Sequence, residues 1–133
     1  MSEAKLTGGC LCGAVRYETT GSPAWAGHCH CSLCRRSSGA AYVSWFVVPS
    51  ATFKFTQGQS ALYASSERAR RGHCAICGTQ LVFLSNRRPE NTAITIASLD
   101  HPGAVQAKEH IFWDDRVPSL SETDDLPKRA QRT

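Results

Sequence analysis

The sequence predicts a mostly β domain, and three observations lead to that prediction. Short segments rich in β-branched and aromatic residues recur along the 133-residue chain. Glycine, proline and serine separate them, roughly every 8–12 residues, as in antiparallel β proteins. No segment has the apolar period of a helix of ordinary length. The length suits one hydrophobic core, so we expect residues 1–133 to form a single domain.

The first half of the chain contains one clear strand and one short helical turn. Residues 14–19 alternate between apolar and polar side chains after a glycine-rich turn, which predicts a strand. Residues 25–34 are polar and rich in cysteine and histidine, and they predict no strand. Ser32 is a suitable N-cap for a helical turn over residues 32–36, with Gly39 just beyond it.

The remaining strands follow from apolar segments between turns. Residues 40–48 form the most apolar segment and predict a buried strand that ends before Pro49. Residues 52–56 alternate phenylalanine with polar residues and predict another strand. Further short strands are expected at residues 61–64, 66–73, 81–84 and 92–97. Residues 128–133 are polar, and we expect this tail to be loose.

Composition narrows the classes of function. Fifteen Lys and Arg against eleven Asp and Glu give a net charge of +4, which mildly favours a small anionic ligand. Nucleic-acid binding usually requires a concentrated basic stripe, so we expect no nucleic-acid partner. No apolar run reaches the length of about 18 residues that spans a bilayer, so we expect no membrane partner. Residues 1–9 lack the apolar core of a secretory signal, and we expect a cytoplasmic protein.

Cysteine is the most informative residue type. The seven cysteines form three short groups, namely Cys10 and Cys12, then Cys29, Cys31 and Cys34, then Cys74 and Cys77. An odd number cannot pair completely within one chain, and the cytosol keeps thiols reduced. Gly13 and Gly78 follow two of the groups, where a positive φ lets backbone amides face the sulfurs. The groups are therefore typical of zinc knuckles, with buried or disulfide-linked cysteines as the alternative.

The number of ligands divides the cysteines between two metal sites. A closed structural zinc takes four ligands, which distant parts of the chain can supply. We expect this four-cysteine cluster to comprise Cys10, Cys12, Cys74 and Cys77. The remaining three-cysteine cluster comprises Cys29, Cys31 and Cys34. Three protein ligands leave one position for water or a substrate thiolate, which is typical of a catalytic zinc.

Two histidines flank the ligands of the three-cysteine cluster. His28 and His30 could each provide a fourth ligand, act as an acid–base group or hydrogen-bond a ligand. The alternative for each is a partly buried polar residue without a role in metal binding.

The cysteine motifs resemble those of the glutathione-dependent formaldehyde-activating enzyme family, also called the centromere-protein-V-like domain. The similarity runs from about residue 8 to residue 127. The matching segments are Gly9-Cys10-Leu11-Cys12-Gly13, Cys29-His30-Cys31-Ser32-Leu33-Cys34-Arg35-Arg36, Arg71 with Cys74-Ala75-Ile76-Cys77-Gly78-Thr79, Leu99-Asp100-His101-Pro102, His110-Ile111-Phe112 and Asp124-Asp125-Leu126-Pro127.

The resemblance implies both a fold and an activity. The fold is a β-tent, in which zinc holds two packed sheets, with two zinc ions per chain. The activity is that of a carbon–sulfur lyase, which joins formaldehyde to glutathione to give S-(hydroxymethyl)glutathione. Family members often carry a tryptophan shortly before the segment that begins at Asp124. Here the aligned position is Ser119, and Trp113 lies six residues earlier.

The residues around the three-cysteine cluster suggest a mechanism. We expect its zinc to bind a small thiol such as glutathione, whose sulfur adds to a small aldehyde. Arg35 and Arg36 follow the last ligand and could bind a substrate carboxylate, or form a solvated face. Trp25 precedes the cluster and could form a wall of the cleft. Arg68 and Arg71 should point to opposite faces of the strand expected there.

Other functions remain consistent with the sequence. The main alternative is a non-catalytic, zinc-stabilised binding or scaffold module, in which the second ion is absent or structural. A nucleic-acid-binding zinc ribbon is a third possibility, which the mild charge excess disfavours.

Overall fold

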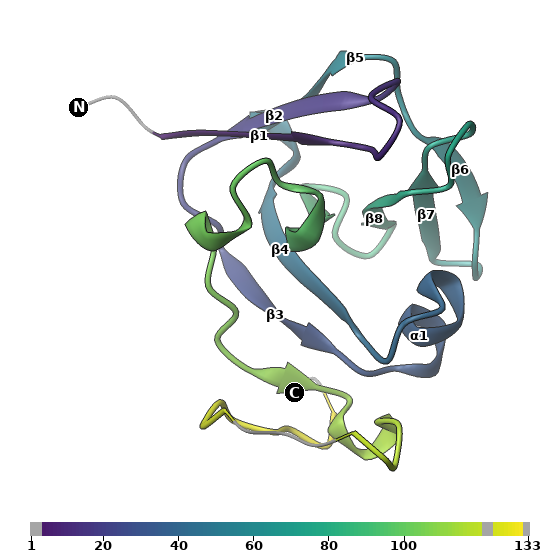
Figure 1. The fold of residues 1–133 in the computed structure, drawn as a ribbon, viewed down its shortest axis with the longest axis vertical. Helices are drawn as coiled ribbons and strands as arrows, with labels where there is room; N and C mark the ends of the chain where they lie inside the picture. The colour runs from purple at the N-terminus through teal and green to yellow at the C-terminus, as the bar shows by residue number, and fades with distance from the viewer. Residues whose placement is uncertain (1–3, 121–123, 132–133) are drawn as a thin grey trace.

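The protein is built from two β-sheets (Figure 1). The computed structural model describes residues 4–120 and 124–131. The smaller sheet has the strand order β1-β2-β5, and the larger has the order β10-β3-β4-β9-β8-β7-β6. The strands are β1 Lys5–Gly9, β2 Arg16–Thr20, β3 Trp25–Cys29, β4 Val43–Pro49, β5 Phe53–Gln57, β6 Ala61–Ala64, β7 Ala69–His73, β8 Gln80–Ser85, β9 Asn91–Thr95 and β10 His110–Ile111. The predicted mostly β fold is confirmed.

The main core lies between the two sheets. Its most deeply buried members are Tyr17, Phe46, Val48, Leu81 and Ile94. The hydroxyl of Tyr17 forms a hydrogen bond with the Ser98 hydroxyl, 2.7 Å away, so it is satisfied within the apolar core. Burial of such large side chains provides most of the driving force for folding.

A second apolar core lies on the other face of the large sheet, and strand β4 contributes side chains to both cores. Phe46 and Val48 face the main core, whereas Val43 and Trp45 join a separate apolar cluster. Side chains alternate between the faces of a strand, so β4 is buried on both sides. The second cluster also contains Cys29 and Cys34. The three-cysteine cluster therefore lies in this second core.

The structure differs from the sequence-based expectation at the first strand, in chain order, of each sheet. Residues 5–9 form β1, although their glycines predicted a turn. Residues 25–29 form β3, although their polarity predicted no strand. Strand β3 pairs with β4 on one side and, in parallel, with β10 on the other. Backbone pairing on both sides thus overrides a weak local preference.

Helix α1, Ser32–Ser38, is longer than the predicted turn and begins differently. Its N-cap is Cys31, whose sulfur accepts a hydrogen bond from the Cys34 amide. The prediction that Ser32 caps the helix is therefore wrong, because Cys31 occupies the N-cap position and its sulfur accepts the hydrogen bond from the Cys34 amide. Gly39 ends the helix, as expected.

The tail binds to the large sheet within the described residues. Lys128 forms a bridge with His110, and the Arg129 amide donates to the His110 carbonyl. These two residues of the tail expected to be loose are therefore held against β10. Residues 132 and 133 lie outside the described residues.

Candidate metal centres

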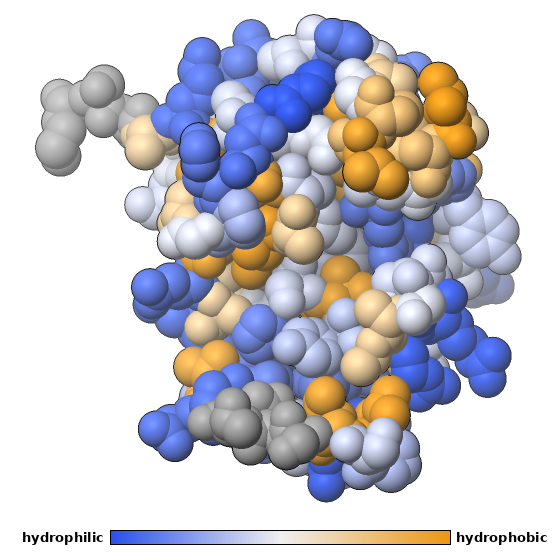
Figure 2. All heavy atoms as spheres, in the orientation of Figure 1, coloured by the Kyte–Doolittle hydropathy of each residue, from blue (hydrophilic) through white to orange (hydrophobic). Residues whose placement is uncertain are grey.

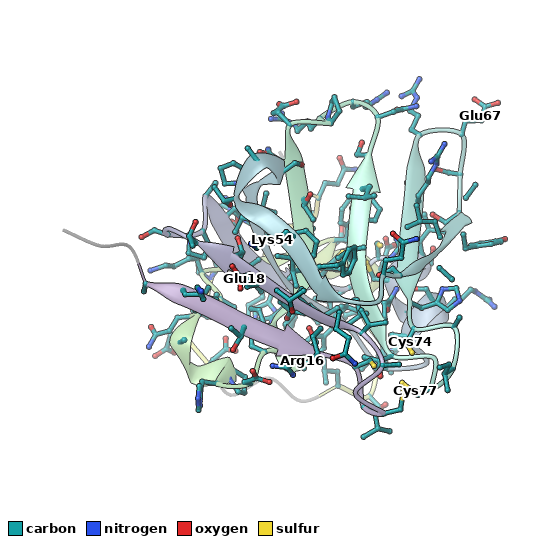
Figure 3. All side chains as sticks on the ribbon, turned by 90° about the horizontal axis from the view of Figure 1, so that it is seen from above. Arg16, Glu18, Lys54, Glu67, Cys74 and Cys77 are labelled. Carbon is teal, nitrogen blue, oxygen red and sulfur yellow. The ribbon has the colours of Figure 1, made fainter. Side chains whose placement is uncertain are left out.

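Two hairpin ends form the four-cysteine cluster. Cys10 and Cys12 lie in the connection between β1 and β2, and Cys74 and Cys77 lie between β7 and β8. Figure 3 shows Cys74 and Cys77 beside the β1–β2 connection. Each connection contains a glycine with a left-handed backbone, at φ 84° and 82°, directly after the second cysteine. The cluster thus joins the small sheet to the large one.

The sulfur geometry of the four-cysteine cluster fits zinc. All four sulfurs lie within 4.8 Å of one another. The Cys10–Cys12 and Cys12–Cys74 sulfur distances are 3.7 and 3.8 Å. Tetrahedral zinc with bonds of about 2.3 Å would place its sulfurs about 3.8 Å apart.

Hydrogen bonds from backbone amides and from Thr79 stabilise negative charge on Cys10, Cys74 and Cys77. The Val15 amide donates to Cys10 over 3.2 Å, and the Ile76 amide donates to Cys74 over 3.4 Å. A hydrogen bond from Thr79 lowers the pKa of Cys77 to about 5. Such donors stabilise thiolates, which are the form that binds metal.

The two connections that carry the four cysteines have exposed tips. Leu11 and Ile76, at the tips of its two connections, are 88% and 77% exposed. Figure 2 shows apolar side chains gathered over the β1–β2 connection. Cys10 lines a neighbouring cavity, whereas the other three cysteines of the cluster do not line it, so their arrangement suits a structural role.

The three-cysteine cluster is compact and mostly buried. Cys29 ends β3, Cys31 caps α1 and Cys34 lies in the first turn of that helix. The Cys34 and Cys29 sulfurs are 3.4 Å apart, and all three lie within 4.8 Å of one another. Hydrogen bonds with Cys29 and Cys34 lower the pKa of Cys31, while those with Cys31 and Cys34 raise the pKa of Cys29. Three sulfurs with one readily ionised thiol form a donor set that fits zinc.

A buried arginine lies against this cluster. The Nη1 of Arg71, from β7, is 3.6 Å from the Cys34 sulfur and 3.4 Å from the Ser37 hydroxyl. The guanidinium also lies over the Phe83 ring, 5.0 Å from its centre. Its Nε is buried without a hydrogen-bond partner among the described residues. A cation in this position offsets the negative charge of thiolates.

A cavity of about 370 Å³ opens beside the three sulfurs. Large apolar side chains form most of its wall: Trp25, Trp45, Val47, Phe83, Ile111 and Phe112. Arg68, Arg71 and Arg87 also line it. The three-cysteine cluster is therefore accessible to a small molecule, and its neighbours can exclude water.

The predicted substrate residues are not all brought together here. Trp25 lines the cavity, as the sequence suggested. Arg35 and Arg36 do not line it, and they instead border a surface depression with Gly39. Arg68 lies on the cavity together with Arg71, although we expected opposite faces. That expectation is wrong because β7 begins at Ala69, so strand alternation does not extend to Arg68.

The histidines belong to a different network. Within the described residues, the three sulfurs group with no histidine. His30 is completely buried, and its Nε2 lies 2.8 Å from the Nδ1 of His110. The Nε2 of His110 lies 3.1 Å from a carboxylate oxygen of Asp124, and His28 bonds the Ser44 hydroxyl. Burial lowers the pKa of His30 to about 4, so it is neutral at pH 7. These contacts fix the C-terminal segment to β3.

Comparison with known proteins identifies the family. The model of the glutathione-dependent formaldehyde-activating enzyme family matches residues 5–115. The chain belongs to this family. A crystal structure of a Rhodobacter sphaeroides protein is also similar, with 27% sequence identity and a TM-score of 0.56. The alignment covers 71% of this chain and 87% of the other.

Family membership and the cysteine geometry are both compatible with metal binding. Both cysteine clusters lie within the matched residues and could hold metal ions. The match ends before Asp124, so it does not include the carboxylate of the histidine network. Among the described residues, no helix is long and apolar enough to cross a membrane.

Proposed function

We propose that this protein is a cytoplasmic, zinc-dependent carbon–sulfur lyase that makes or cleaves the adduct of a thiol and a small aldehyde. The reaction would resemble that of S-(hydroxymethyl)glutathione synthase. The single observation that supports it best is the position of Cys29, Cys31 and Cys34 at the wall of a cavity. The four-cysteine cluster would hold a second, structural zinc.

The chemistry requires no oxidant. The thiol sulfur forms a bond to the aldehyde carbon, the carbon–oxygen π bond opens, and the thiol proton ends on oxygen. Zinc held by the three cysteines would supply positive charge that lowers the pKa of the substrate thiol. Arg71 would limit the negative charge around the sulfurs, since it lies 3.6 Å from Cys34. Trp25 and the other apolar walls would exclude water from the thiol.

A thiol screen tests this proposal. Zinc-loaded protein is mixed with formaldehyde and with glutathione, smaller thiols or larger thiols, and adduct exchange is followed by NMR. We expect at least one thiol to exchange faster with protein than without it, and we expect no acceleration by heat-unfolded protein. Equal rates with and without protein for every thiol would contradict the proposal.

Metal release separates the enzyme from the scaffold alternative. We expect two zinc ions per chain, one of which a weak chelator removes without loss of the circular dichroism of the fold. One tightly held zinc, with the thiols of Cys29, Cys31 and Cys34 free to react with a thiol reagent, would favour a non-catalytic module.

A further inference from the structure

The walls of the cavity are poorly suited to a peptide. Trp45 is 5% exposed and packs against Phe83 with ring centres 6.0 Å apart. Val47, Ala93 and Ile111 extend the same apolar surface. Glutathione carries two amides, an ammonium and two carboxylates. Burying such groups against these side chains would remove their hydrogen bonds to water without replacement.

The charged side chains that line the cavity are arginines. Apart from the cysteines, its polar lining consists of Arg68, Arg71 and Arg87 with Ser66 and Ser85. No acidic side chain lines it among the described residues. An anionic group on a ligand would therefore find arginine partners, and an ammonium group would find no carboxylate partner there.

The position of one nearby acid supports this assignment. Glu67 precedes Arg68 in the chain but does not line the cavity. Figure 3 shows Glu67 at the tip of the β6–β7 connection, with its side chain pointing outward. Both residues border a neighbouring depression, but only Arg68 of the two lines this cavity.

Two residues that line the cavity have features typical of binding sites. The Nε of Arg71 has no acceptor among the described residues, although only 6% of Arg71 is exposed. Phe112 lines the cavity from a left-handed backbone conformation, at φ 55°. Residues other than glycine adopt this conformation at a cost, and such strained residues concentrate at functional sites.

We propose that this cavity selects an apolar thiol with one terminal carboxylate, and not a zwitterionic peptide such as glutathione. This inference rests on the proposed function for the thiol chemistry, but the selection itself is a property of the cavity. The sulfur of the ligand lies toward the three-cysteine cluster, and its aromatic or branched body contacts Trp45 and Phe83. Its carboxylate lies at the mouth, where Arg68 and Arg87 are exposed.

Binding of thiol-free probes tests the selection without turnover. Trp25 and Trp45 line the cavity, so their fluorescence reports occupancy of the zinc-loaded protein. The probes are 3-phenylpropanoate, its neutral amide, S-methylglutathione and acetate. We expect 3-phenylpropanoate to bind about tenfold tighter than the amide, because charge-assisted hydrogen bonds are about twice as strong as neutral ones. S-methylglutathione and acetate should bind more weakly still.

Arginine variants identify the groups responsible. In the Arg68→Gln/Arg87→Gln double variant, the preference for 3-phenylpropanoate over its amide should fall to near unity. Both residues are exposed, so the fold and zinc content should be unchanged. The matched control is Arg35→Gln/Arg36→Gln, which removes the same charge outside the cavity and should bind all probes as the wild type does.

The outcomes separate this inference from the proposed function. Equal binding of S-methylglutathione and 3-phenylpropanoate, or an unchanged preference in the Arg68/Arg87 variant, would overturn the selection. Selective probe binding without acceleration for any thiol would leave the selection standing and contradict the proposed function. Faster adduct exchange with glutathione than with 3-mercapto-2-benzylpropanoate would support the lyase and refute the selection.

Discussion

The two cysteine clusters consist of the same side chain but differ in how far apart their members lie in the sequence and in their access to a cavity. The four-cysteine cluster joins segments that are 62 residues apart in the chain, and the tips of its connections are exposed. The three-cysteine cluster comes from six consecutive residues, and it lies beside an apolar cavity. The first cluster ties the two sheets together. The second contributes little to the connectivity of the fold but offers its sulfurs to a small molecule.

The comparison teaches that the sequence separation of the ligands indicates the role of each cluster. A cross-link between distant segments restrains the unfolded chain and brings together parts that the hydrophobic core must also bring together. Ligands within one short connection restrain almost nothing beyond their own turn. Changes at the two clusters should therefore affect different properties.

The largest effect is expected for Cys77→Ser, which removes one ligand of the four-cysteine cluster. Structural zinc contributes about 10–16 kcal/mol in small zinc domains, which equals or exceeds the total stability of most domains. We expect the variant to lose cooperative unfolding, measured by circular dichroism during heating. Ala75→Ser, in the same exposed connection, is the matched control and should unfold as the wild type does. A folded Cys77→Ser protein that retains two zinc ions would refute the structural role.

Cys31→Ser should have the reverse effect. The serine hydroxyl can accept the hydrogen bond from the Cys34 amide that the sulfur accepts now, and serine is a preferred N-cap. We therefore expect the stability to change by less than about 1 kcal/mol, measured by urea unfolding. Adduct exchange should fall to the rate without protein, and the zinc content should fall from two ions to one. Unchanged turnover would show that this cluster is not the reactive site.

The sequence revealed the two cysteine clusters but not the cavity. The spacing of the cysteines was sufficient to divide them four and three, because metal ligands form short local motifs. Arg71 approaches Cys34 from β7, 37 residues away, and His110 meets His30 from 80 residues away. Such contacts depend on strand order and register, which no local pattern specifies. The order of the large sheet was unpredictable for the same reason, because β3 gained its place through β4 and β10.

Asp100→Asn provides the smallest test, because it weakens a separate link between the small sheet and the segment that follows β9. Asp100 receives a bidentate hydrogen bond from Arg16 of β2, with one distance of 2.9 Å, and a further bond from Thr7 of β1. Both side chains of the ion pair are about a third exposed, so solvent screens it. We expect the variant to lose less than about 1 kcal/mol in urea unfolding, and less again at high salt.

The pH dependence of that loss is also predicted. Hydrogen bonds from Arg16 and then Thr7 lower the pKa of Asp100 to about 2. Because the folded-state pKa lies below the unfolded value, the stabilisation is complete above about pH 5, and it is lost progressively as the pH falls from there through the folded-state pKa. The difference between wild type and Asp100→Asn should therefore be the same at pH 6 and pH 8. Asp115→Asn, at an exposed aspartate of the short helix Trp113–Asp115, is the control. A loss as large as that of Cys77→Ser would mean that the small sheet is held mainly by this ion pair and not by the sulfurs.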